Sequence, residues 1–353
     1  MPLLLDTARS GAAVELRGTN CMTIGLVNNM PDAACEATER QFLDLIRAAT
    51  WNAVVHLKLF SIADVPRADP VRRALAERYR DVAELWDTQL DGLIVAGTEP
   101  RAAKLEDEPY WATLTKLADW ARHNTVSAIW SCLAAHAAVL HADGTARRPL
   151  SEKKFGLFDC DVVAPHPLMT GMKPRLRVPH SRYNDLPEGA LAAGGYRFLT
   201  RSAAAGADAF VREEQGGSLF VFFQGHPEYE TDTLLREYRR DVGRFLRGER
   251  EHYPAPPEGY FNEAATALVN GFRARTASGL DANLIADFPF AALEPALENT
   301  WRRSAIGVYE NWIVYLKDRK AQLRTSMVPA PRSRRGARRI GGMRPVADRW
   351  SAG

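Results

Sequence analysis

The chain has 353 residues, of which 46% are hydrophobic and 25% charged, enough for one large α/β domain or two ordinary ones. Its net charge is only +3, and the seven arginines after Ser326 more than account for it, so the rest of the chain has no basic surface suited to nucleic acid. No apolar run approaches the roughly 20 residues of a membrane span, and the start, MPLLLD, is unlike a secretory signal. We therefore expect a cytoplasmic protein with neither nucleic acid nor membrane as a partner.

The cysteines are few and scattered. Cys21, Cys35, Cys132 and Cys160 show no CxxC or other metal-ligand spacing. This pattern predicts a reducing compartment, no disulfide framework and no metal site.

Apolar runs and amphipathic stretches alternate in the first half of the chain. We expect buried strands at 21–29, 54–62, 92–97 and 126–130, and helices at 34–50, at 69–87 and from residue 109 onward. Strands separated by helices of this length indicate βαβ units. The fold class is therefore α/β, with a mostly parallel sheet flanked by helices.

The second half is less regular. Hairpins are expected around 157–163, a long loop at VPHSRYNDLP, a strand at 218–223 and a helix at 231–247. An aromatic-rich helix, TWRRSAIGVYENWIVYLKDR, follows near the end, and it packs either on the core or on a second subunit, so a homodimer is possible. We expect a domain at 1–255, a helical extension packing on it at 256–325, and a disordered basic tail at 326–353.

The stretch TVSAIWSCLAAHAA has the pattern of a nucleophile elbow. A β-run ends at Cys132, and small helix-forming residues follow at once. On such a tight turn the side chain enters a cleft, and free N–H groups of the next helix stabilise a thiolate or an oxyanion. The alternative is that Cys132 is simply a small buried apolar residue at a strand end.

A second group of reactive side chains follows the strand at 218–223. His226 and Glu228 flank the rigid Pro227 in the sequence QGHPEYE. A cysteine nucleophile needs an imidazole to form its thiolate, and the imidazole needs a carboxylate to fix its tautomer. Cys132, His226 and Glu228 supply these three groups, although a His-Pro-Glu loop by itself is often structural.

Several fragments in the same order resemble one known family, the homoserine O-acyltransferases of the trans-succinylase type. The fragments are NNMPDAACEATERQFLDLI, DGLIVAGTEP with PYW, SAIWSCLAAHAA, SEKKFG, VPHSRYNDLP, FQGHPEYETDTLLREYRRD and TWRRSAIGVYENWIVYL. The resemblance implies a class I glutamine-amidotransferase-like (flavodoxin-like) fold with extra C-terminal helices.

The resemblance also implies roles for single residues. Cys132 matches the cysteine that carries the acyl group, His226 its proton acceptor and Glu228 the residue that orients the histidine. The family's substrate-binding residues fall on Lys153, Ser181 and Arg240. The ordinary alternatives are that Lys153 is a surface charge, Ser181 a turn former and Arg240 an exposed helix residue.

Three features depart from the family. The lysine that follows the MP of the first loop is replaced by Asp32, and the segment 262–299 has little counterpart. The third departure is Arg101. At the matching position, family members that use succinyl-CoA have a small residue, and members that use acetyl-CoA have glutamate. Because an arginine can pair with a succinyl carboxylate, Arg101 favours succinyl, although it can equally point to solvent.

The resemblance implies a ping-pong transfer of an acyl group from succinyl-CoA to the hydroxyl of L-homoserine, a step toward methionine. Acyl-CoA is then a co-substrate, and no cofactor is expected. The N–H groups of Leu133, Gly97 and Thr98 are the expected oxyanion donors.

Other readings stay open. Acetyl-CoA is an alternative donor, and serine an alternative acceptor. A glutamine amidotransferase or cysteine hydrolase would use the same three residues, although the elbow lacks the glycine two positions after the cysteine that amidotransferases favour. The last alternative is a non-catalytic binding protein that has kept the scaffold.

Overall fold

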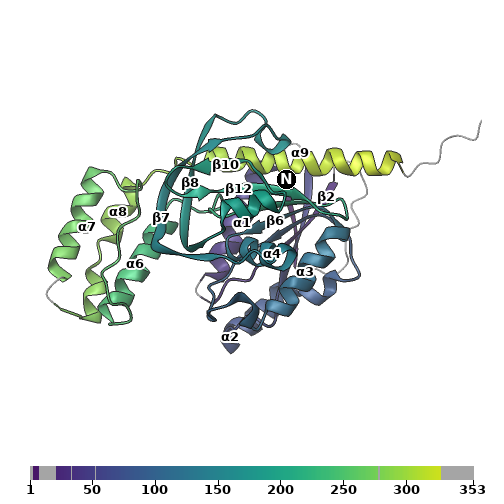
Figure 1. Ribbon diagram of the computed structural model, residues 1–353. Coiled ribbons are helices and arrows are strands. Elements are labelled where there is room, and N and C mark those ends of the chain that lie inside the picture. Colours follow the sequence, from purple (N-terminus) through teal and green to yellow (C-terminus); the bar gives the residue numbers. More distant parts are fainter. Residues whose placement is uncertain (1–2, 8–20, 33, 52, 277–278, 327–353) are drawn as a thin grey trace, which may run out of the picture.

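The computed structural model describes residues 3–7, 21–32, 34–51, 53–276 and 279–326 (Figure 1). Of the tail predicted at 326–353, Ser326 ends the last helix, and residues 327–353 lie outside the described residues.

One large sheet of nine strands forms the centre of the molecule. Its order is β1-β3-β2-β5-β6-β13-β12-β9, and β4 pairs with β3. The strands are β1 (Leu3–Asp6), β2 (Cys21–Val27), β3 (Val54–Ser61), β4 (Arg80–Asp81), β5 (Leu90–Val95), β6 (Thr125–Ser131), β9 (Arg197–Phe198), β12 (Ala209–Glu213) and β13 (Leu219–Phe223). All pairs are parallel except those that β12 makes with β13 and β9. The predicted mostly parallel sheet is confirmed, and β1 adds an edge strand that the sequence analysis missed.

Helices cover both faces of this sheet, because its central strands are apolar on both sides. On one face α3 (Trp111–Asn124), α4 (Leu133–Asp143) and α5 (Glu188–Ala193) pack in a cluster that includes Trp130. On the other face α1 (Cys35–Ala49) and α9 (Arg302–Ser326) pack in a cluster that includes Ile129. Neighbouring residues of one strand thus serve opposite layers.

A second, antiparallel sheet stands beside the first. It consists of β7 (Arg148–Val162), β8 (Arg175–Asp185), β10 (Thr200–Ser202) and β11 (Gly206–Ala207), in the order β11-β10-β7-β8. The prediction of a loop at VPHSRYNDLP is therefore wrong over most of its length. Proline indicated a loop, but β8 is an edge strand, where Pro179 opposite Leu157 costs no interior ladder bond.

The remaining helices lie at the ends of the sheet. The predicted helix at 69–87 is shorter, since α2 (Asp69–Arg78) ends before buried Tyr79, β4 and the 3-10 turn η1 (Val82–Leu85). Further along, α6 (Thr233–Leu246), α7 (Glu263–Thr276) and α8 (Phe290–Leu293) share a third hydrophobic cluster beside β7 (Figure 1). The other 3-10 turns are η2 (Leu105–Asp107), η3 (Pro167–Met169), η4 (Ala282–Asp287) and η5 (Glu294–Ala296).

The aromatic helix α9 runs back across the central sheet. Tyr309 and Trp312 are buried there, and the indole N–H of Trp312 donates to Ser127 Oγ of β6 at 3.0 Å. Lys320 pairs with Asp91 at the start of β5, at 2.6 Å. This helix therefore packs on its own core, and a homodimer stays a prediction. None of the helices in the described ranges is long and apolar enough to cross a membrane.

The contact between α9 and the sheet leads to a stability prediction. A Cβ atom at Gly92 of β5 would lie 2.8 Å from atoms of both Trp312 and Leu316. We expect Gly92→Ala to lower the free energy of unfolding by about 1–3 kcal/mol through overpacking, measured by denaturant titration.

The matched control is Gly271→Ala in α7, where a Cβ meets no atom within 4 Å. It should leave stability unchanged or raise it by up to about 1 kcal/mol, because alanine favours helix. Equal effects of the two changes would contradict tight packing of α9 on β5.

Candidate active site

Cys132 occupies a strained turn between β6 and α4. It is the one non-glycine residue with a positive φ (51°) in the described part of the chain, and a side chain there costs about 1–3 kcal/mol. The turn is held by the Cys132 N–H, which donates to the carbonyl of Phe223 in β13 at 2.7 Å. The thiol is partly exposed, whereas the other three cysteines are buried. This is the geometry expected of a nucleophile elbow.

The glycine turn after β5 lies against this elbow. A Cβ at Gly97 would come within 3.1 Å of both the Leu133 nitrogen and the Ser131 oxygen, so a glycine permits the close approach. Leu133 opens α4, where backbone N–H groups have no partner within the helix. The arrangement suits the oxyanion role predicted for Leu133, Gly97 and Thr98, which stays a proposal.

The loop that follows β13 brings His226 to the same edge of the sheet. Its backbone N–H donates to the carbonyl of Pro179 in β8 at 2.8 Å. The neighbouring Gly225 N–H donates to the buried carboxylate of Asp208 at 3.2 Å. Both strand ends that carry reactive groups thus meet, because β6 and β13 are adjacent and parallel.

The imidazole of His226 lies between a carboxylate and the thiol. Its Nδ1 is 2.8 Å from Glu228 Oε1, and it also hydrogen-bonds with Cys132. Burial disfavours the charged ring, but the Glu228 carboxylate and the Cys132 sulfur outweigh it and raise the pKa of His226 well above its usual value. The structure therefore brings Cys132, His226 and Glu228 together in the arrangement of a nucleophile, a base and an orienting carboxylate.

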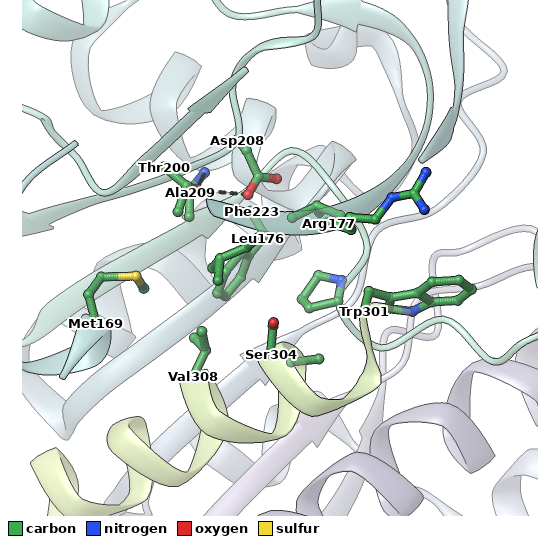
Figure 2. Close-up of a pocket in the computed structure, with 13 residues that line it drawn as sticks. Met169, Leu176, Arg177, Thr200, Asp208, Ala209, Phe223, Trp301, Ser304 and Val308 are labelled. Carbon is green, nitrogen blue, oxygen red and sulfur yellow. Dashed lines mark hydrogen bonds between the residues drawn. The ribbon is translucent and has the colours of Figure 1, made fainter. Parts of the chain in front are cut away.

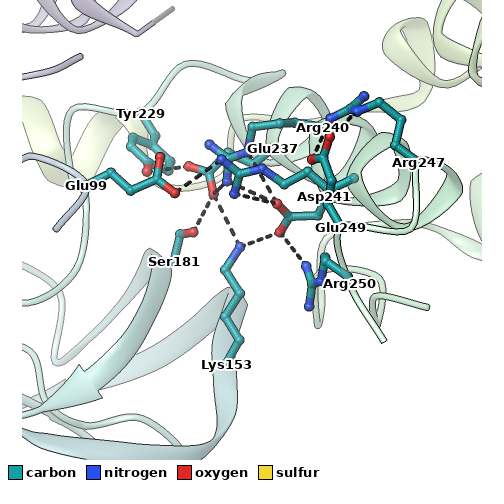
Figure 3. Close-up of polar contacts among 11 residues, drawn as sticks. Glu99, Lys153, Ser181, Tyr229, Glu237, Arg240, Asp241, Arg247, Glu249 and Arg250 are labelled. Atoms are coloured by element: carbon teal, nitrogen blue, oxygen red, sulfur yellow. Dashed lines mark hydrogen bonds and ion pairs between the residues drawn. The ribbon is translucent and has the colours of Figure 1, made fainter. Parts of the chain in front are cut away.

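The predicted substrate residues form a charged network near this array (Figure 3). Lys153 of β7 lies 3.0 Å from Asp241 and 3.6 Å from Glu237, both on α6. Ser181 of β8 donates to Glu237, and Arg240 lies 3.9 Å from that carboxylate. Burial opposes ionisation of Glu237, yet Lys153 and Arg240 outweigh it and lower its pKa. The three predicted residues therefore meet around one ionised carboxylate.

Sequence reasoning missed the residues that link this network to the histidine. The Tyr229 ring stacks on His226 with centroids 4.3 Å apart, and its hydroxyl donates to Glu237 at 2.6 Å. The indole N–H of Trp301 in turn donates to the Tyr229 carbonyl at 2.9 Å. In the sequence, Tyr229 directly follows the His-Pro-Glu motif and Glu237 lies four residues before Asp241, so neither stands out. Only the fold brings Tyr229 and Glu237 into contact.

The two single residues that depart from the family motifs, Arg101 and Asp32, both make contacts with nearby backbone. Arg101 is exposed, and its guanidinium reaches the Pro66 carbonyl at 3.4 Å. Asp32 accepts the backbone N–H of Ala68 at 3.1 Å, just before α2. Asp32 therefore serves the local structure of the loop, and its position supplies no cation.

A cavity lies beside the loop that follows β13, lined by Pro227, Asp208 and residues of β8 and α9 (Figure 2). Its volume of about 30 Å³ has room for one or two water molecules. It is far too small for an acyl-CoA.

A buried group of potential metal ligands lies next to this cavity. Donor atoms of Cys160, His180 and Asp208 lie within 4.8 Å of one another. However, the Arg182 Nε–H donates to His180 Nδ1 at 3.3 Å, so the ring's own proton resides on Nε2, which faces Asp208 at 3.4 Å. A protonated nitrogen is no metal ligand, so this group fits a polar network supporting the Gly225 loop.

Comparisons with known proteins point to one family. A family model described as homoserine O-succinyltransferase matches residues 8–322. Proteins named homoserine O-succinyltransferase from Methylorubrum extorquens and Rhodopseudomonas palustris are each 48% identical to the chain. The matches cover 85% of the chain and 88% of the first protein, and 83% of the chain and 87% of the second.

Solved structures resemble the chain more distantly. A glutamine amidotransferase from Thermotoga maritima has a TM-score of 0.47 at 12% identity, covering 84% of the chain and 98% of that protein. A glutamine amidotransferase from Methylobacillus flagellatus has the same TM-score at 18% identity, covering 84% and 95%.

The His226–Glu228 contact predicts a pH-dependent contribution to stability. Because the pKa of His226 is raised on folding, its contribution is fully present below the ordinary value of about 6.5 and is lost as pH rises through the folded pKa. We expect Glu228→Gln to lower the free energy of unfolding by about 1.5–3 kcal/mol near pH 6, and by less at pH 9. Denaturant titration at both pH values measures this.

The matched control is Asp119→Asn, which removes an exposed carboxylate that lies 2.9 Å from the half-buried His141 and 2.7 Å from Arg122. Solvent screens the exposed carboxylate, so its loss should cost under about 1 kcal/mol at either pH. A pH-independent cost of Glu228→Gln would contradict the paired imidazolium.

Proposed function

The chain belongs to the homoserine O-succinyltransferase family, and from that premise we propose that it transfers the succinyl group of succinyl-CoA to the hydroxyl of L-homoserine through Cys132. The carrying observation is the Cys132–His226–Glu228 array, with a charged network suited to an amino acid beside it. No cofactor enters this chemistry, because a thiolate and an imidazole suffice for acyl transfer.

The first half-reaction forms an acyl-cysteine. The Cys132 thiolate attacks the thioester carbonyl, and the oxyanion that forms accepts N–H bonds from Leu133 and the Gly97–Thr98 turn, each worth roughly 3 kcal/mol. The intermediate collapses, and the leaving coenzyme A thiolate takes its proton from His226. His226 is then neutral, with Glu228 holding its Nδ1.

In the second half-reaction His226 accepts the proton of the homoserine hydroxyl. The resulting alkoxide attacks the acyl-cysteine carbonyl, and the ester leaves with Cys132 again a thiolate. Glu237, reached by the Tyr229 hydroxyl, is placed to bind the substrate ammonium, and Arg240 to bind its carboxylate. The product is an activated ester that serves methionine synthesis. A reduced cytoplasmic setting belongs to this proposal, because the mechanism needs a free thiol.

A cysteine hydrolase or glutamine amidotransferase would use the same array. The network of Lys153, Glu237, Arg240 and Asp241 favours transfer to a zwitterionic acceptor over attack by water. Release of ammonia from glutamine would favour the amidotransferase instead.

Arg240 provides the test of the acceptor side. We expect Arg240→Met to raise the KM for homoserine about 10- to 100-fold, because a charge-assisted contact is lost, while acylation of Cys132 by succinyl-CoA alone keeps its rate. Steady-state kinetics and single-turnover mass measurements check the two halves.

Arg236→Met is the control, since Arg236 lies on the same helix and pairs with Asp232 at 2.6 Å. It should alter neither quantity. An Arg240→Met enzyme with an unchanged KM for homoserine would refute the assigned contact.

A further inference from the structure

The loop after β2 contacts the glycine turn through the side chain of Asn29. Asn29 is 2% exposed, and its Nδ2–H donates to the Ala96 carbonyl at 3.1 Å. Ala96 directly precedes Gly97, so the accepting carbonyl and the Gly97 N–H belong to one planar peptide group. The Gly97 N–H is one of the donors proposed above for the oxyanion. Whatever fixes this peptide group therefore also fixes that donor.

The geometry of the peptide group sets the direction of this N–H. In a trans peptide the N–H and the C=O point opposite ways, and the described residues contain no cis peptide bond. Strand β5 lies between β2 and β6, and the Ala96 carbonyl points to the β2 side, where Asn29 lies. The Gly97 N–H therefore points to the β6 side, where β6 leads into Cys132. The two residues are close, since a Cβ on Gly97 would lie 3.5 Å from the Cys132 Cβ.

The Gly97 N–H is available to a ligand. Gly97 is buried, and its N–H donates to no acceptor among the described residues. Buried backbone N–H groups without a partner are rare in native proteins. An oxyanion formed on Cys132 would supply the missing acceptor.

The loop that carries Asn29 is itself held by a buried arginine. The guanidinium of Arg67, which is 6% exposed, donates to the carbonyls of Asn28 at 2.9 Å and Met30 at 3.1 Å. These are the residues on either side of Asn29. A third bond reaches the Ile62 carbonyl, just after β3, at 3.0 Å. Because all these bonds go to backbone carbonyls, Arg67 fixes the shape of the loop, and a fixed loop can in turn fix a neighbouring peptide group.

Asn29 carries a cost that an apolar residue would avoid. Its Oδ1 is buried and has no hydrogen-bond partner in the described structure. An unpaired buried acceptor lowers stability, and leucine, which has a similar volume, would bring no such atom. Stability alone therefore does not account for an asparagine at this position, whereas the bond to the Ala96 carbonyl does.

We propose that Asn29 is a positioning residue that aims the Gly97 N–H at the oxyanion formed on Cys132. This inference rests on the proposed function and adds to it a residue that touches neither substrate. Without the Asn29 bond, the peptide group between Ala96 and Gly97 can rotate and turn its carbonyl dipole toward the developing negative charge. An N–H that is aimed in advance needs no reorganisation during the reaction.

The test follows acylation of Cys132 by succinyl-CoA without acceptor, measured by intact mass in single turnovers. Asn29→Leu should slow this step at least about tenfold, because removing one oxyanion donor costs about 10²–10³-fold and this change misaligns a donor without removing it. Its melting temperature should stay within about 4 °C of the wild-type value. Asn29→Asp keeps the shape of the side chain but turns a carboxylate oxygen toward the Ala96 carbonyl, so it should be slowed at least as much.

A second readout separates the aim of the N–H from a general disturbance of the site. Iodoacetamide alkylates the Cys132 thiolate by displacement at a saturated carbon, so no oxyanion forms. Its rate in Asn29→Leu, measured on the peptide that contains Cys132, should stay within about twofold of wild type. The matched control is Asn124→Leu, at the opposite end of β6, which removes an amide that donates to the Trp120 carbonyl at 2.9 Å. It should change neither rate.

The outcomes separate the hypotheses. A wild-type rate of succinylation in Asn29→Leu would overturn the proposal. Succinylation and alkylation slowed to the same degree, or a large fall in melting temperature, would make Asn29 a structural residue and would overturn it as well. A wild-type protein that forms no succinyl adduct on Cys132 would refute the proposed function instead.

Discussion

The parallel pairing of β6 with β13 is the constraint on which the rest of the site depends. Ser131 pairs with Phe223 at the last register position, and the next N–H, that of Cys132, donates to the Phe223 carbonyl. One strand end therefore holds the strained cysteine, and the loop from its neighbour brings His226 and Glu228. A shift of one residue in this register would turn the side chains of β13 to the opposite faces and separate the thiol from the imidazole.

The C-terminal helix stabilises this pairing from behind. Trp312 donates to Ser127, whose own hydroxyl donates to the Leu219 carbonyl at 2.6 Å, so one hydrogen-bonded chain joins α9, β6 and β13. At the start of α9, Trp301 fixes the Tyr229 backbone, and the Tyr229 ring stacks on His226. The helix therefore supports the amino-terminal part of this strand pair and, through Tyr229, the imidazole, although it lies far from them in the sequence.

The sequence predicted what local pattern and chain order encode. The apolar run before Cys132 and the run before His226 identified adjacent strand ends, since parallel strands present their carboxyl ends at one edge. Local sequence pattern failed to predict the structure where contacts between distant segments determine it. Pro179 suggested a loop, but an edge position tolerates it. Glu237 has no sequence signal, because an ionised carboxylate inside a network of charges is a property of the packed structure.

The central claim is that Cys132 carries the acyl group between the two substrates. The most direct test is to mix the wild-type protein with succinyl-CoA in the absence of homoserine and to weigh the intact chain and its peptides. The account predicts a stoichiometric succinyl adduct on the peptide containing Cys132, which disappears when homoserine is added. An unmodified Cys132 in an enzyme that nevertheless forms the ester would contradict the account, because acyl transfer would then proceed directly between the substrates.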